Sequence, residues 1–101
     1  MDDIMLLIIG VFISVIGIVN MTGNISTIHS YNRRKVTEED VPKYGRAVGI
    51  GTLSIGVSIV IGFFLQLAGL PEVMGAVIIV GILIGIAFIL YAQFKYNKGI
   101  F

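Results

Sequence analysis

The sequence predicts an all-α membrane protein with three transmembrane helices and a charged juxtamembrane loop between the first two. Three observations support this prediction. The composition is 56% hydrophobic and 13% charged, whereas soluble domains carry about 25% charged residues. The mean hydropathy is +1.00. Finally, residues 4–32, 47–71 and 73–94 contain no Asp, Glu, Lys or Arg, and each run is long enough for a membrane-crossing helix, which needs about 20 apolar residues.

The first transmembrane helix is expected from about residue 4 to residue 22. The chain begins with the acidic sequence MDD, and a secretory signal would begin with positive charge, so we interpret this segment as a membrane span. Beyond it, apolar residues recur at spacings typical of one helix face; these are Ile18, Met21, Ile25 and Ile28. We therefore expect the helix to continue as an amphipathic extension to about residue 31.

Charge is concentrated in the stretch HSYNRRKVTEEDVPKYGR, residues 29–46. The chain has seven Lys or Arg and six Asp or Glu. Eight of these charged residues lie in this stretch, namely Arg33, Arg34, Lys35, Glu38, Glu39, Asp40, Lys43 and Arg46. We interpret residues 32–41 as a charged loop. Whether its 37–41 part is helical is left open by the sequence.

The second transmembrane helix is expected from about residue 42 to residue 68. A helix that started at Thr37 would place Pro42 inside it, where the proline ring clashes with the preceding turn. A fresh start with Asp40 as the N-cap avoids this clash, and a carboxylate also suits the positive end of the helix dipole.

The third transmembrane helix is expected from about residue 71 to residue 96. The sequence Gly69-Leu70-Pro71 marks the break before it, since Gly is favoured just past a helix end and Pro in a first turn. The connection is short, so the second and third helices should form an antiparallel hairpin. The third helix ends in tyrosines and lysines, which commonly anchor a helix at the membrane interface.

Charge also predicts the orientation of the three spans. The stretch of residues 29–46 holds five Lys or Arg and the C-terminal segment holds Lys95 and Lys98, whereas the N-terminal segment and the turn at 69–72 hold none. Positive residues favour the cytoplasmic side. We therefore expect the N-terminus outside and the C-terminus inside, with the charged loop in the cytoplasm and the chain in the cell membrane.

Small residues recur at helical spacing in the predicted spans. Such residues let helix backbones approach each other closely. We expect them to form the helix-packing surfaces, either within one three-helix unit or between copies of the chain; they are Gly45, Gly49, Ser54, Ser58, Gly62, Gly81 and Gly85.

Several classes of function are not expected. The chain has no cysteine and one histidine, His29, so we predict no metal site and no cofactor. No charged residue lies in the centre of a span, where transporters place ion-binding groups. The polar residues Asn20, Gln66 and Gln93 lie towards helix ends, where water is expected to hydrate them. We predict that the protein is not an enzyme. Nucleic acid is not an expected partner, because acidic residues follow the basic ones.

The charged segment resembles part of a family of small bacterial and archaeal membrane proteins of unknown function, which have about three transmembrane helices. The resemblance covers roughly residues 20–60, and the matching residues are Tyr31, Asn32, Glu38, Glu39, Asp40, Lys43, Tyr44 and Gly49. A fainter likeness is to the immunity-type membrane proteins of the SdpI group, which also carry an Asn-containing loop before a transmembrane helix. The resemblance implies membrane residence and assigns no catalytic residue.

The leading functional hypothesis is therefore a small non-enzymatic membrane protein. We expect it to associate with itself, with a partner membrane protein or with membrane lipid through residues 29–46. The candidate interaction residues are Tyr31, Asn32, Arg33, Arg34, Glu38, Glu39, Asp40 and Tyr44. The alternative is a pore-forming protein of the phage holin kind, and a transporter or channel subunit is a third hypothesis.

A reporter fused to the C-terminus tests the predicted orientation. The charged loop and the C-terminus lie on the same side of a three-span protein, and both carry Lys or Arg. A reporter that is active only in the cytoplasm is therefore expected to be active in this fusion. Activity only of a reporter that works outside the cytoplasm would contradict the orientation.

Overall fold

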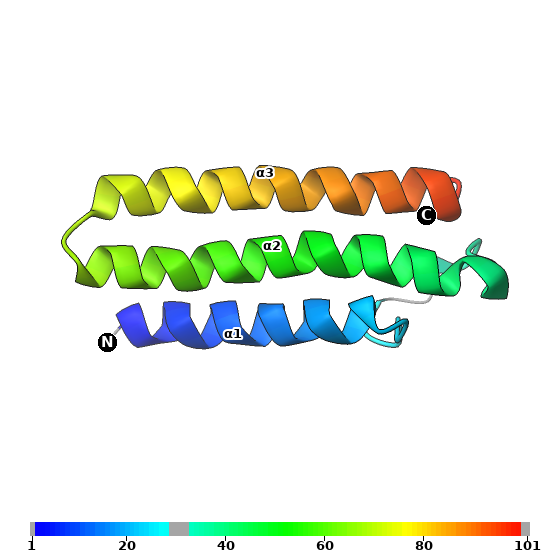
Figure 1. Ribbon diagram of the computed structural model, residues 1–101, viewed down its shortest axis with the longest axis horizontal. Helices are drawn as coiled ribbons and strands as arrows, with labels where there is room; N and C mark the ends of the chain where they lie inside the picture. Colours follow the sequence, from blue (N-terminus) through cyan, green and yellow to red (C-terminus); the bar gives the residue numbers. More distant parts are fainter. Residues whose placement is uncertain (1, 29–32, 100–101) are drawn as a thin grey trace.

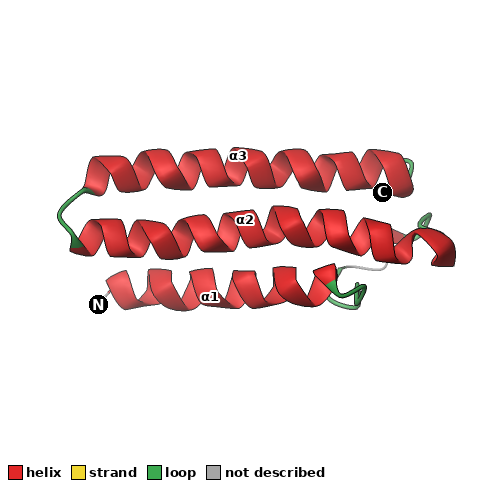
Figure 2. Cartoon of the chain, in the orientation of Figure 1, coloured by secondary structure: helices red, strands yellow, loops and turns green. Residues whose placement is uncertain are grey.

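Three long helices make up nearly all of the computed structural model, which describes residues 2–28 and 33–99. They are α1 (Asp2–Met21), α2 (Val41–Leu67) and α3 (Pro71–Tyr96), and a short 3-10 helix, η2 (Glu38–Asp40), precedes α2. No strand occurs among these residues (Figure 2). All three helices are long and apolar enough to cross a membrane, which is the arrangement of a multi-pass membrane protein.

The helix α2 lies between α1 and α3 and runs antiparallel to both (Figure 1). The molecule is 46 Å long, which exceeds the roughly 30 Å of a bilayer hydrocarbon core. The outer faces of α1 and α3 expose large apolar side chains, including Phe12 and Leu83. Apolar side chains of this kind pack favourably against lipid tails, because lipid tails are equally apolar.

The contact between α1 and α2 depends on glycines that bring the two backbones together. A Cβ atom added at Gly49 would lie 2.5 Å from the carbonyl oxygen of Gly17, and one added at Gly17 would lie 2.6 Å from the backbone nitrogen of Leu53. One helical step further along, Gly56 faces Ser14, whose hydroxyl donates a 2.7 Å hydrogen bond to the carbonyl of Gly10 in its own helix. Larger residues at these positions would force the helices apart.

A second set of small residues on α2 faces α3. A Cβ added at Gly51 would lie 2.5 Å from the carbonyl oxygen of Gly85, and one added at Gly81 would collide with Ser58. Gly62 faces Ile78 in the same interface. The small residues of α2 that the sequence predicts for helix packing divide between two faces of the helix. Gly45 and Gly49 contact the α1 side, whereas Ser54, Ser58 and Gly62 contact α3. The reason is that the step from Gly49 to Ser54 is five residues, which turns the series to another side of the helix.

The turn between α2 and α3 is closed by a glycine in the left-handed conformation. Gly69 has φ 78°, and its N–H donates to the carbonyl of Gln66 at 3.0 Å, while the N–H of Leu70 donates to the carbonyl of Leu65 at 2.9 Å. This pair of bonds is the Schellman motif, which satisfies carbonyls at a helix end. Pro71 then opens α3, as the sequence predicted.

The predicted amphipathic extension of the first helix is wrong over the residues that the structure describes. Helix α1 ends at Met21, and residues 22–28 form turns; the expected end near residue 31 lies outside the described residues. Gly23 has φ 98°, a conformation that a right-handed helix does not contain. The chain turns back at this point, so that Ile25 is buried against α2 while Ile18 stays exposed. The two residues therefore do not share a helix face.

Two glycine substitutions test the close helix packing. The variant Gly49→Ala is expected to lower the free energy of unfolding by about 1–3 kcal/mol, because the added Cβ meets backbone atoms that cannot move independently. The variant Gly75→Ala is the matched control, because nothing lies within 4 Å of the added atom. It should be neutral or stabilise the helix by up to about 1 kcal/mol. Unfolding in detergent micelles measures both, and equal effects would contradict the packing described.

Candidate functional site at the charged end of the bundle

Four polar side chains are buried where α1 ends, α2 begins and α3 ends. Tyr44 and Asn97 are 0% exposed, Asn20 is 1% exposed and Gln93 is 6% exposed. A buried polar group is costly unless it forms hydrogen bonds. The hydrogen-bond partners of these four side chains therefore show which segments of the chain are joined at this end of the bundle.

Asn20 fixes the chain that leaves α1. Its amide nitrogen donates to the carbonyl of Asn24 at 2.9 Å and to the hydroxyl of Thr27 at 2.8 Å. The N–H of Gly23 donates in turn to the carbonyl of Asn20 at 2.9 Å. These bonds replace the helical bonds that an extension of α1 would have made, and they hold the reversed chain against the helix end.

Tyr44 joins α2 to α3. Its hydroxyl donates a short hydrogen bond to the Oε1 atom of Gln93. Around this bond lies the main cluster of buried apolar residues, which draws on the segment after α1, on α2 and on α3; its members are Ile25, Tyr44, Ala47, Val48 and Ala92. Val36 and Val41, on either side of η2, pack against the same cluster. The core of the protein therefore lies at this end of the bundle.

Asn97 joins the charged segment to the end of α3. Its Oδ1 atom accepts a 2.9 Å hydrogen bond from the backbone N–H of Lys35, and its Nδ2 atom donates to the carbonyl of Gly99 at 2.8 Å. The backbone turns at Lys98, which has φ 63°, and the N–H of Gly99 then bonds to the carbonyl of Gln93 at 3.1 Å. The last turn of α3 is thereby shaped to receive the backbone of the charged segment.

The described part of the charged segment is consequently a folded cap on the bundle. We use the term charged cap for residues 33–40. Within it, Arg33 is partly buried and its Nε atom donates to the carbonyl of Ile28 at 2.9 Å. The side chains of Arg34, Lys35, Glu38 and Glu39 are exposed.

The candidate interaction residues are thus in different situations. Asp40 is partly exposed and precedes α2 without a side-chain capping bond. Tyr44 is fully buried, so it serves the fold and is not available to a partner. Tyr31 and Asn32 lie outside the described residues, as does His29.

The buried amides are the residues of this site that the sequence did not predict. Asn20 and Gln93 were expected to be hydrated at helix ends, but the reversed chain after α1 and the tail after α3 cover them. Asn97 was not identified at all. A usable signal existed for the last two, because Gln93 and Asn97 are four residues apart and so lie on one face of a helix.

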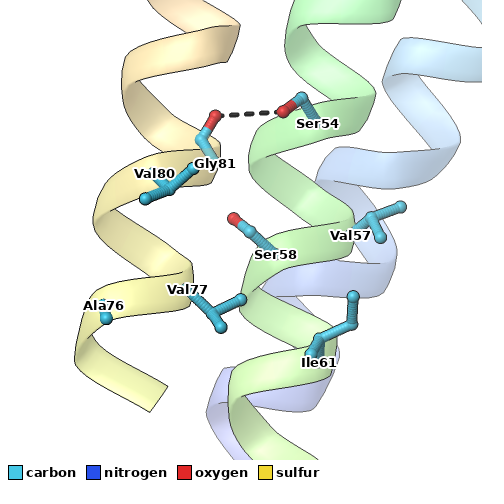
Figure 3. A pocket seen from close by; sticks show the side chains of 8 residues that line it. All are labelled: Ser54, Val57, Ser58, Ile61, Ala76, Val77, Val80 and Gly81. Carbon is cyan, nitrogen blue, oxygen red and sulfur yellow. Dashed lines mark hydrogen bonds between the residues drawn. The ribbon is translucent and has the colours of Figure 1, made fainter. Parts of the chain in front are cut away.

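An apolar groove lies between α2 and α3, and Figure 3 shows the side chains that line it. It has a volume of about 410 Å³ and is lined by Ser54, Val57, Ser58, Ile61, Ala76, Val77, Val80 and Gly81. Both serine hydroxyls are engaged: that of Ser54 donates to the carbonyl of Gly81 at 3.0 Å, and that of Ser58 to the carbonyl of Ile55 at 2.8 Å. The groove therefore presents mainly hydrocarbon to whatever fills it.

Neither a metal site nor a similar protein assigns a function to this end of the bundle. Residues 2–28 and 33–99 contain no group of three or more His, Asp or Glu side chains that could hold a metal ion. The chain matches no protein-family model, no curated protein and no solved structure. The resemblance noted for residues 20–60 therefore stays a prediction.

Replacing Asn97 tests how the charged cap is held. The variant Asn97→Ala removes the acceptor for the Lys35 N–H, and loss of a buried partner costs about 1–3 kcal/mol. Amide hydrogen exchange at Lys35 should accelerate by about tenfold or more, while exchange in the middle of α2 should not change. The control is Asn24→Ala, since the Oδ1 atom of Asn24 accepts from Ser26 instead. If Lys35 exchanged at the same rate in all three proteins, Asn97 would not hold the cap.

Proposed function

We propose that the protein is a small, non-enzymatic, multi-pass protein of the cell membrane that binds a partner protein through the charged cap. The observation that carries this proposal is the hydrogen bond from the Lys35 backbone to the buried Asn97 side chain. It gives the cap a defined position on the bundle, with the side chains of Lys35, Glu38 and Glu39 exposed.

A segment that only sets the orientation of the protein in the membrane does not need a defined conformation. Orientation in the membrane depends on how many Lys and Arg residues lie on each side, and an unstructured loop of the same composition would serve. Buried polar groups that are fully bonded fix one conformation at the cost of desolvating them. The buried Asn97, which bonds to the backbone of Lys35, therefore supports a role that depends on the shape of the cap.

The exposed charges of the cap suit a protein partner with both charge signs. Within residues 2–28 and 33–99, Lys35, Glu38 and Glu39 form no ion pair. Rim charges of this kind steer association and select partners. The predicted orientation places the cap on the cytoplasmic side, where a soluble protein or the loop of another membrane protein could reach it. A second copy of the chain is one such partner.

The holin hypothesis receives less support from the exposed surfaces. A water-filled pore built from several copies needs polar side chains on the faces that line it. The large exposed side chains of the described part of α1 are apolar, including Ile8, Val11, Phe12 and Val15. An abrupt collapse of the membrane potential on controlled expression would favour the holin over the interaction protein.

The transporter hypothesis lacks a charged group at the depth where such proteins bind ions. Between residues 47 and 71 and between 73 and 94 the chain has no Asp, Glu, Lys or Arg. Ion flux into proteoliposomes that contain the purified protein alone would favour a channel or transporter subunit.

Site-specific photocrosslinking in native membranes tests the proposed function. A crosslinking residue at position 38 or 39 is expected to give a discrete protein adduct, and the same residue at position 73, which is exposed at the opposite end of the bundle, should not give that adduct. The charge reversals Lys35→Glu and Glu39→Lys should reduce the adduct at position 38 several-fold. A differently tagged second copy shows whether the partner is the protein itself. Equal adducts at positions 38 and 73, or adducts that survive both reversals, would overturn the proposal.

A further inference from the structure

A second site lies where the start of α2 faces the end of α3. A hollow of about 200 Å³ is lined there by Lys43, Arg46, Ala47, Ile50, Phe88, Tyr91 and Tyr96. It uses none of the three side chains of the charged cap on which the proposed function depends. The inference drawn from it would therefore hold if that proposal failed.

Two cationic side chains of α2 line this hollow, and a third, on α3, contacts a tyrosine that lines it. Lys43 and Arg46 are three residues apart on α2, so they lie on one face of that helix, and both are exposed. From α3, the ammonium of Lys95 donates a 3.0 Å hydrogen bond to the hydroxyl of Tyr91. It lies 5.4 Å from the centre of the Tyr91 ring and 5.7 Å from the centre of the Tyr96 ring.

The two tyrosines, which line the hollow, hold the third cation in place. Their rings pack edge to face with centroids 6.3 Å apart, and the hydrogen bond to the Tyr91 hydroxyl fixes the ammonium beside them. Lys95 therefore loses part of its freedom to extend into water. Two positive groups line the hollow, and a third contacts the tyrosines that line it, so an anion placed there would be attracted by all three.

The hollow continues into apolar surface. A second hollow of about 260 Å³ is lined by Ala87, Phe88 and Tyr91, and it shares Phe88 and Tyr91 with the first. Ala87 and Phe88 lie further from the helix end than Tyr91, within the membrane-spanning stretch of α3. A ligand that filled both hollows would need an anionic part at the interface and a hydrocarbon part directed into the membrane.

From this arrangement we infer that the cleft between the start of α2 and the end of α3 binds an anionic phospholipid. The headgroup phosphate lies among Lys43, Arg46 and Lys95, and one acyl chain lies on Ala87 and Phe88. Basic pockets between transmembrane helices at the membrane surface bind anionic headgroups in this way. A free phosphate has no hydrocarbon part to fill the apolar hollow, and a zwitterionic lipid carries a positive charge that these cations would repel.

Asp40 limits the affinity of the site for an anion. Its negative charge exerts a weak attraction on the Lys95 ammonium. Its side chain makes no capping hydrogen bond to α2, so its charge can be removed without loss of such a bond. Removing it should leave the fold intact and strengthen anion binding, which is the opposite of the effect of removing a cation.

Native mass spectrometry of the full chain in detergent micelles tests the inference, with phosphatidylglycerol as the probe and phosphatidylcholine as the zwitterionic comparison. The wild type is expected to bind phosphatidylglycerol at least tenfold more tightly. Each cation near a membrane surface contributes about fivefold in affinity, so Lys43→Gln with Arg46→Gln should weaken binding by about 25-fold. The matched control Lys35→Gln, which removes an exposed lysine outside the hollow, should change it by less than about twofold.

Two further variants separate the parts of the site. Asp40→Asn should tighten phosphatidylglycerol binding by about twofold to fivefold. Ala87→Phe, at an exposed position, should weaken phosphatidylglycerol binding because the larger side chain fills the apolar hollow. Equal binding of both lipids, equal loss in the double variant and the Lys35→Gln control, or displacement of the lipid by millimolar inorganic phosphate would each overturn the inference. Circular dichroism of every variant confirms that the helices are retained.

Discussion

The close approach of α2 to two neighbours at once is the constraint on which the rest of the structure depends. Lipid tails are as apolar as leucine, so helices gain little from burying apolar side chains against each other, and they associate through close packing instead. Helix α2 meets this requirement on two sides, at Gly49 and Gly56 for α1 and at Gly51 and Ser58 for α3. Each side repeats at seven residues, which is two helical turns. The central helix can therefore stay in register with both partners along its length.

The charged end of the bundle is held by a different kind of interaction. There the backbones must stop, reverse and meet, and water competes for every polar group. Burial of Asn20, Tyr44, Gln93 and Asn97 removes that competition, and hydrogen bonds become stronger where the surroundings are less polar. The apolar cluster around Tyr44 supplies the shielding. Close packing at glycines thus holds the three helices together within the membrane. Shielded hydrogen bonds hold them together at its surface.

The regular parts of the fold could be predicted from the sequence, and the reversals could not. Uncharged runs with Pro42, Gly69 and Pro71 as boundaries place the helix ends within one residue of the observed ones at 41–67 and 71–96, because these residues act on their own backbone. The turn after Met21 depends on contacts that are distant in the sequence, such as that of Ile25 with the α2 face. The same holds for Lys35 and Asn97, which are 62 residues apart. Local patterns carry no information about such a pair.

The three-residue connection between α2 and α3 has a mechanical consequence. The Schellman turn at Gly69 joins the two helices at one end. Any separation of the helices would therefore be a rotation about that end. The widest opening would then fall at the opposite end, where Tyr44 is bonded to Gln93 and the Lys35 backbone to Asn97. Those two bonds resist separation at that end. Strengthening or breaking them at the membrane surface would therefore change the packing of α2 against α3 along its length.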